Sequence, residues 1–379
     1  MPSVALPSVA FRRLTVVGLV LAVVASTGCA RGAKSDNAAD PANPSAAPAH
    51  PMLALGYRPE WKGYPQVDPK AGIKFIDVLG DSVAVHDNRN ILTVMEPDTG
   101  RNRWSLDLGS PLMKFVGNAR AADDLYACSE SEVQVLDIRT GQIKARQRLS
   151  TLANTRPVVT KGVAVFGCTT GEVLGHSLVT GFKAWGYKLE GTVSADPVAV
   201  GDSVSVVSQA GDVIILDPRT GESFGRRRAI FGGLTNDPVA TDSAVFIAGT
   251  DQSVWAFSVN GKPIWRVRTP DHLTAQPALH DNAVILTIPS AGLTALDTGT
   301  GAKLWSSPDI NGRVVAVRNS RLVVWDRAGG TLMTVDARHG DIVERAPIPN
   351  VTLIATDKFV DGDLYLANKD GSVDRLSPR

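Results

Sequence analysis

The chain has 379 residues and a nearly balanced charge, with 39 Lys and Arg against 38 Asp and Glu. This balance argues against an electrostatic role at nucleic acid or at an anionic membrane surface, because both call for a marked positive excess. The 35 glycines and 23 prolines are the residues that many tight turns require.

Residues 1–28 have the features of a signal peptide. Two arginines precede the apolar run 14–25, which is too short to cross a bilayer and has the length of a signal-peptide core. Small residues at 26–28 then lead to Cys29. This segment resembles the lipobox of bacterial lipoproteins, in which the cysteine carries lipid, although Ser26 stands where that pattern prefers leucine. We expect lipid on Cys29; an ordinary secretory signal with an incidental cysteine is the alternative.

Residues 29–50 are rich in Ala, Pro, Asn and Ser. Such a composition cannot bury a core and predicts a lipidated, flexible tether. Ala30, directly after the cysteine, is compatible with sorting to the outer membrane by the lipoprotein rule. We therefore expect an exported bacterial lipoprotein of the cell envelope, held at the outer membrane and facing the periplasm.

From residue 51 to residue 379 the sequence is repetitive. Seven glycines that close short polar turns recur at intervals of about 40 residues, which is the sequence signature of a β-propeller. These anchor glycines are Gly100, Gly141, Gly181, Gly221, Gly261, Gly301 and Gly340.

Each repeat contains four short segments typical of strands. In residues 196–228, for example, apolar runs at 198–200, 204–207 and 213–216 are separated by Gly and Asp turns, and a more polar fourth segment follows. Four runs of this kind predict one four-stranded antiparallel sheet per repeat.

The fourth segment often carries a tryptophan four residues after the anchor glycine. These are Trp104, Trp185, Trp265 and Trp305, while Ala145, Gly225 and Glu344 occupy the same place elsewhere. Residues 295–305, ALDTGTGAKLW, match the motif A-x-D-x-x-T-G-x-x-x-W. The region from about residue 55 to 379 thus resembles the PQQ-like (quinoprotein-type) propellers. The resemblance implies that each tryptophan lies between neighbouring blades, where a flat aromatic side chain buries a large area.

The position of the last repeat predicts how the ring closes. An eighth unit begins near Val351, but its next anchor glycine would fall near position 381, so the unit lacks a fourth strand. We expect residues 55–65, which include Trp61 and Tyr64, to supply that strand and close an eight-bladed propeller without open edges. A WD40 propeller is the competing interpretation, and Trp325-Asp326 is the only pair of its type.

The sequence contains few signs of chemistry. The six histidines are scattered without metal-ligand spacing, and the chain has no nucleophile elbow and no P-loop. We therefore expect no catalytic, cofactor-binding or metal-binding residues. The basic run Arg226-Arg227-Arg228 is interpreted as a solvated outer strand rather than a ligand site.

Two cysteines occupy equivalent positions in neighbouring repeats. Cys128 and Cys168 each precede their anchor glycine by thirteen residues. Equivalent points on adjacent blades lie roughly 9 Å apart at this radius, beyond the ~7 Å that a disulfide spans. We predict two buried free thiols.

Three classes of function remain open. The lipid-anchored propeller resembles accessory factors of outer-membrane protein assembly, which implies a non-catalytic, monomeric scaffold that binds envelope proteins such as a β-barrel assembly complex and no nucleic acid. A surface or periplasmic receptor for a sugar or peptide is the second. A PQQ-dependent dehydrogenase is the third, and the adjacent cysteine pair of those enzymes is missing. We expect binding loops at one rim, with the irregular segments 117–124, 226–234 and 269–274 as candidates.

Overall fold

Short runs of β-branched and aromatic residues, separated by Gly and Asp turns, form 32 strands and one short 3₁₀ helix in the computed structural model, which describes residues 50–379. The helix η1 spans Pro51–Leu53, and the first half of the strands are β1 (Tyr57–Gly63), β2 (Ile73–Val78), β3 (Val83–Asp87), β4 (Ile91–Met95), β5 (Asn102–Asp107), β6 (Phe115–Ala121), β7 (Asp124–Ser129), β8 (Glu132–Asp137), β9 (Ile143–Arg148), β10 (Val158–Thr160), β11 (Val163–Gly167), β12 (Glu172–Ser177), β13 (Lys183–Lys188), β14 (Val198–Val200), β15 (Ser203–Val207) and β16 (Asp212–Leu216). The second half are β17 (Ser223–Arg228), β18 (Val239–Ala240), β19 (Ala244–Gly249), β20 (Ser253–Ser258), β21 (Pro263–Arg268), β22 (Ala278–His280), β23 (Ala283–Ile288), β24 (Gly292–Asp297), β25 (Lys303–Ser307), β26 (Arg313–Arg318), β27 (Arg321–Asp326), β28 (Thr331–Asp336), β29 (Ile342–Pro347), β30 (Val351–Thr356), β31 (Leu364–Asn368) and β32 (Val373–Pro378).

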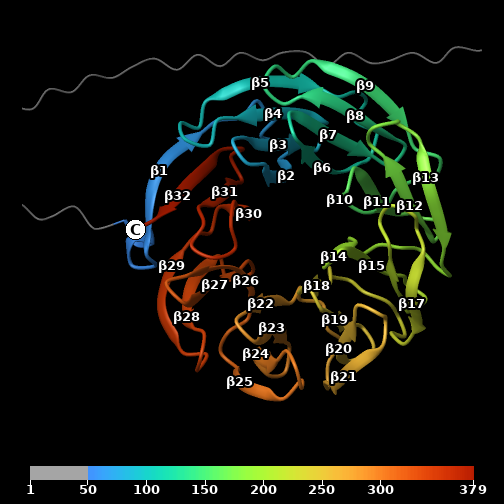
Figure 1. The fold of residues 1–379 in the computed structure, drawn as a ribbon. Coiled ribbons are helices and arrows are strands. Elements are labelled where there is room, and N and C mark those ends of the chain that lie inside the picture. The colour runs from blue at the N-terminus through green and yellow to red at the C-terminus, as the bar shows by residue number, and fades with distance from the viewer. Residues whose placement is uncertain (1–49) are drawn as a thin grey trace, which may run out of the picture. The chain divides into compact units, whose positions relative to one another are not determined.

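The strands form eight separate four-stranded antiparallel sheets arranged in a ring (Figure 1). Blade 1 is β2–β5, blade 2 is β6–β9, and the count continues in chain order to blade 7, β26–β29. The first strand of each blade lies nearest the centre of the ring and the fourth lies outermost (Figure 1). The predicted eight-bladed propeller is therefore confirmed.

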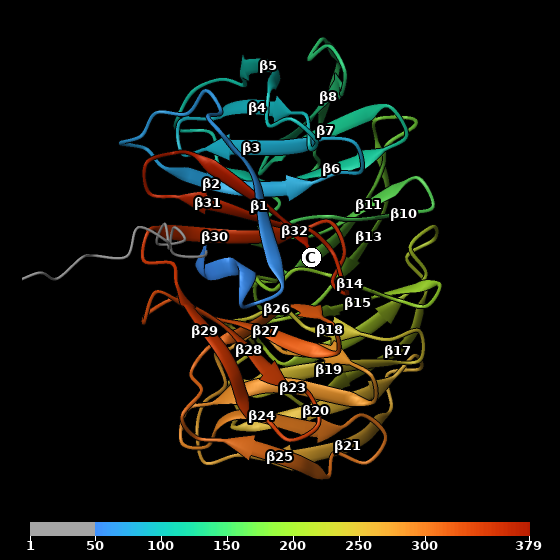
Figure 2. The same cartoon turned by 90° about the vertical axis from the view of Figure 1, so that its left-hand side faces the viewer.

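Blade 8 combines the two ends of the propeller. Its order is β1-β32-β31-β30, so the outer strand comes from the beginning of the described chain (Figure 2). β1 pairs antiparallel with β32 from Tyr57↔Pro378 to Gly63↔Val373, with an irregularity between Pro59 and Trp61. The predicted closure by an N-terminal strand is thus correct, and it gives every blade its full set of four strands.

The hydrophobic core is divided into eight clusters, one at each seam between adjacent blades. The two middle strands of a blade are buried on both faces, as in β15 and β16, whereas the outermost strand β17 is mostly exposed. This explains why the middle strands read as continuous apolar runs and the fourth as a polar segment. Stability therefore comes largely from blade-to-blade packing.

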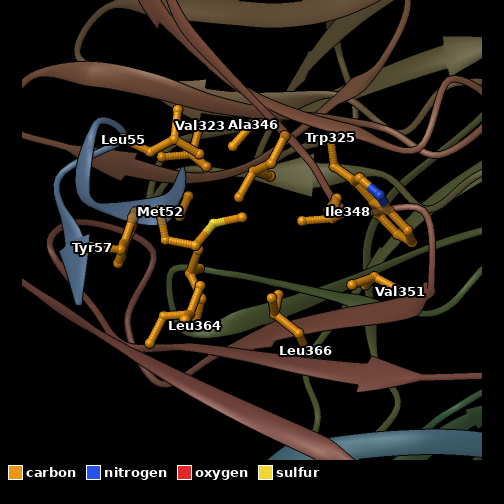
Figure 3. Packing of buried hydrophobic residues seen from close by; sticks show 13 residues of the cluster. Met52, Leu55, Tyr57, Val323, Trp325, Ala346, Ile348, Val351, Leu364 and Leu366 are labelled. Carbon is orange, nitrogen blue, oxygen red and sulfur yellow. The ribbon is translucent and has the colours of Figure 1, made fainter. Parts of the chain in front are cut away.

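The seam between blades 7 and 8 is filled by the helix η1. Met52 in the helix and Leu55 just after it are buried there in one cluster with Val323, Ile348 and Leu364 (Figure 3). The guanidinium of Arg318 donates to the backbone carbonyl of Gly56 at 3.1 Å and so ties this segment to blade 7. The residues before β1 thus take part in closure as well.

Cys128 and Cys168 are both buried free thiols in the seam between blades 2 and 3, as predicted. Burial raises the pKa of both, that of Cys168 to about 12, so neither forms a thiolate readily. Within residues 50–379, no helix combines the length and the apolar character needed to cross a bilayer.

Candidate functional site

The anchor glycines and the tryptophans meet across the blade seams. All seven glycines have φ between 68° and 79°, in the left-handed region that favours glycine. A Cβ atom on Gly100, Gly141 or Gly221 would lie 2.6 Å from the indole of Trp61, Trp104 or Trp185 respectively. In each case the tryptophan belongs to the preceding blade, so the outer strand of one blade covers the turn of the next.

Each of these tryptophans also makes the same hydrogen bond. The indole N–H donates to the backbone carbonyl three residues before the glycine that it covers. The five bonds run from Trp61 to Pro97, Trp104 to Ile138, Trp185 to Pro218, Trp265 to Thr298 and Trp305 to Ala337, at 2.7–2.9 Å. This repeated contact supports the expected docking role.

Other groups take over in the three remaining seams. Between blades 2 and 3, the Gln147 side chain lies on Gly181 and donates to the carbonyl of Leu178 at 3.0 Å, in the manner of an indole. Between blades 4 and 5, Gly225 lies directly against the backbone at Gly261. Between blades 7 and 8 the helix η1 fills the space. Sequence reasoning missed Gln147 because it lies two residues beyond the tryptophan position.

One rim of the propeller carries exposed apolar side chains in the connections between its blades. We call this the connection rim, defined by the segments 108–114, 149–157, 229–238 and 269–277, each of which joins the outer strand of one blade to the inner strand of the next. Leu112, Leu152 and Phe231 on it are exposed by 92%, 49% and 70%. On the opposite rim, Val179 and Phe182 of the blade 3 turn are exposed, and so is Val360 in the turn between β30 and β31. Exposed apolar groups on a rigid base favour protein binding.

The three irregular segments fall on different parts of the fold. Residues 229–234 and 269–274 lie on the connection rim, whereas 226–228 belong to the outer strand β17. The segment 117–124 was wrongly expected to be a loop, since most of it belongs to strand β6 and the turn to β7 at the opposite rim. Arg226 and Arg228 are not merely solvated either, because both pair with the buried Asp212, at 2.9 and 3.4 Å.

Charged side chains meet at the inner strands on the side of the connection rim. Arg156 forms an ion pair with Asp77 at 2.7 Å, and its backbone N–H donates to Asp196 at 2.8 Å. The backbone N–H of Asp196 donates in turn to Asp237 of the next blade at 2.8 Å. Burial, together with the charge of Asp237, raises the pKa of Asp196 to about 7. These polar contacts link blade 3 to blade 1, blade 3 to blade 4, and blade 4 to blade 5.

A cavity of about 460 Å³ opens beside this network, and we call it the channel-mouth cavity. Its lining includes Asp237, Gln276, Arg313, Trp325 and Arg327. Among residues 50–379, no group of three or more His, Cys, Asp or Glu side chains is arranged to hold a metal ion. The predicted lipid site Cys29 lies outside the described residues.

Comparison with known proteins gives the family. The family model described as outer membrane protein assembly factor BamB matches residues 61–260 and 209–372, which together cover most of the propeller. The chain belongs to the BamB family.

Individual BamB proteins resemble this chain over most of its length. The BamB of Burkholderia pseudomallei is 23% identical over 320 residues, covering 79% of this chain and 83% of the relative. That of Yersinia pestis is 22% identical over 324 residues, covering 78% and 81%. The crystal structure of BamB from Moraxella catarrhalis has a TM-score of 0.69 at 19% identity, and the match covers 85% of this chain and 97% of that one. A computationally designed protein, Ika8, superposes with a TM-score of 0.68, so the fold alone does not specify a function.

Proposed function

We propose that this chain is a non-catalytic scaffold of the bacterial cell envelope that assists the assembly of outer membrane proteins. The observation that carries the proposal is the BamB family match, which spans nearly all blades of the ring. The relatives from Burkholderia pseudomallei and Yersinia pestis bear the name of assembly factors. The repeats are committed to packing between blades, which leaves the rims for recognition.

In this proposal the chain reaches its partner from the membrane. Lipid on Cys29 would hold the protein at the outer membrane, and residues 29–50 would act as a tether on the periplasmic side. The partner would be an envelope protein of a β-barrel assembly complex, bound by a monomeric propeller.

We further propose that the connection rim carries the contact, because Leu112, Leu152 and Phe231 each expose apolar surface on a different connection of blades 1–5. The test replaces all three residues with serine and measures co-purification of β-barrel assembly proteins from detergent-solubilised membranes. We expect co-purification to fall severalfold while the melting temperature is unchanged, because exposed side chains contribute little to folding.

A matched control replaces Val179 and Phe182 on the opposite rim, which are at least as exposed as Leu152 and Phe231. This variant should retain the partner. If only the control variant lost the partner, the contact would instead be assigned to the opposite rim. If the unaltered chain captured no assembly protein, the proposed function itself would be wrong.

A further inference from the structure

The channel-mouth cavity contains two arginines that stand around one tryptophan. Arg313 lies opposite Trp325 in the antiparallel pair of β26 and β27, so the two side chains are cross-strand neighbours. Arg327 follows Trp325 by two residues, in the turn directly after β27. The guanidinium carbons lie 5.4 Å and 5.8 Å from the centre of the Trp325 ring.

Neither guanidinium is in direct contact with a carboxylate of residues 50–379. No Asp or Glu of residues 50–379 forms an ion pair with Arg313 or Arg327. Asp237 lines the same cavity, but its carboxylate accepts the backbone N–H of Asp196. Asp326, between Trp325 and Arg327, accepts the backbone N–H of Gly329. Burial and the adjacent charge of Arg327 lower the pKa of Arg313, and the charge of Asp237 only partly opposes them.

Trp325 is itself unusual. It is only 3% exposed, and its indole N–H has no acceptor, whereas the other six tryptophans of residues 50–379 all donate to an oxygen. A buried donor without a partner is costly. Because its ring is buried, Trp325 offers no free face on which a sugar could stack.

Blade 5 contains a complete version of the same arrangement. There Arg266 stacks on Trp255, with its guanidinium carbon 4.4 Å from the ring centre. One carboxylate oxygen of Asp251 accepts both the indole N–H, at 3.0 Å, and the guanidinium, at 3.1 Å. In blade 5, a carboxylate of the chain itself thus accepts the hydrogen bonds of both the tryptophan and the arginine. In blade 7, no carboxylate does so.

We propose that Arg313 and Arg327, next to Trp325, bind a carboxylate that comes from outside the fold. Guanidinium groups match the planar geometry of a carboxylate with paired hydrogen bonds. The cavity of about 460 Å³ leaves room for the ligand around its acidic group, as for a peptide that ends in a free carboxylate. This site is independent of the proposed assembly function, which rests on the family match and the rim.

The test is isothermal titration of the full chain in detergent with acetyl-dialanine, which has a free carboxylate, and with the amide of the same peptide. We expect the acid to bind with one site per chain and to weaken as salt is added, whereas the amide does not bind. Arg313→Gln and Arg327→Gln should each weaken binding about tenfold. Arg321→Gln, an exposed arginine at the start of β27, is the matched control and should bind normally.

A second variant tests the same site through stability. Gln276→Glu places a carboxylate in the lining, so it should abolish peptide binding and raise the melting temperature by a few degrees. Equal binding of acid and amide, no binding of either, or binding untouched by both arginine substitutions would overturn the proposal. Binding of inorganic phosphate is measured in the same way. If phosphate binds more tightly than the peptide and its binding is lost in the same variants, the site recognises another class of anion, and the assignment to a carboxylate is wrong.

Discussion

At the scale of single residues, the propeller depends on one contact that is repeated around the ring. Five tryptophans each cover a glycine turn and donate to its carbonyl, while Gln147 makes the same hydrogen bond with a much smaller side chain. The tryptophan seams therefore combine a buried aromatic ring with the hydrogen bond, whereas the Gln147 seam has the hydrogen bond without the ring.

The first prediction uses this difference. Trp185→Ala should lower the free energy of unfolding by about 3–5 kcal/mol, because it removes a large buried side chain and leaves a cavity in the seam between blades 3 and 4. Gln147→Ala should lower it by less, about 2 kcal/mol, because it removes two hydrogen bonds, to the carbonyl of Leu178 and to the buried His176. Denaturant titration followed by circular dichroism measures both. Equal losses in the two variants would show that the indole ring adds nothing beyond its hydrogen bond.

The second prediction concerns the pH dependence of stability at Asp196. Its pKa is raised by burial to about 7 in the folded protein, so the folded state holds the proton more tightly than the unfolded state does. The resulting stabilisation is complete below about pH 4 and is lost as the pH rises through about 7.

Asp196→Asn should therefore be more stable than the unaltered protein at about pH 8, by about 2 kcal/mol, and the difference should shrink towards about pH 4. An asparagine side chain still accepts the backbone N–H of Arg156. Asp242→Asn, an exposed site, serves as the control. Thermal unfolding across this pH range checks the prediction, and parallel curves for Asp196→Asn and the unaltered protein would contradict it.

At the scale of elements, the repeat spacing predicted much of what the structure contains. Runs at 198–200, 204–207 and 213–216 correspond closely to β14, β15 and β16, because Gly and Asp turns bound each strand. The phase of the last repeat also predicted the pairing of β1 with β32. Such features are local or strictly periodic, and a single sequence records them directly.

Features that break the repeat could not be predicted in this way. The helix η1 fills the last seam, which has no anchor glycine, and its role depends on contacts with distant strands. The cluster of Arg313, Arg327 and Trp325 likewise arises from the register of β26 on β27. The sequence showed Trp325 only as half of a Trp-Asp pair, and the orientation of its neighbours requires the three-dimensional arrangement.

The third prediction tests the closing elements. Deleting residues 51–65 should destabilise the propeller far more than deleting residues 31–48, because the first change removes β1, the edge of blade 8, together with the helix that fills the last seam. Met52→Ala is the milder form and should cost about 2–4 kcal/mol, since the side chain is buried among blades 7 and 8. Melting temperatures provide the measurement. Identical values for the two deletions would exclude closure by this segment.

At the scale of the whole molecule, the fourth prediction concerns attachment to the membrane. Cys29→Ala should abolish lipid labelling and release the propeller from the membrane fraction, because the propeller's charge-balanced composition gives it little attraction to a lipid surface. Fractionation of cells that express each form, with a labelled fatty acid as tracer, provides the test. A Cys29→Ala protein that is still processed normally and still sediments with membranes would show that the lipoprotein interpretation is wrong.

The pairing of β1 with β32 also means that blade 8 can form only when synthesis of the chain is nearly complete. Ser377 on β32 donates to Glu60 on β1, although the two residues are 317 positions apart. A chain made from its amino end therefore carries an unpaired β1 until β32 emerges, which takes about half a minute at ordinary rates of translation. During that interval the open edge is a target for chaperones and proteases. A premature stop codon that removed only β32 would leave blades 1–7 complete in sequence. It would remove the strand that joins β1 to β31, so the ring could not close.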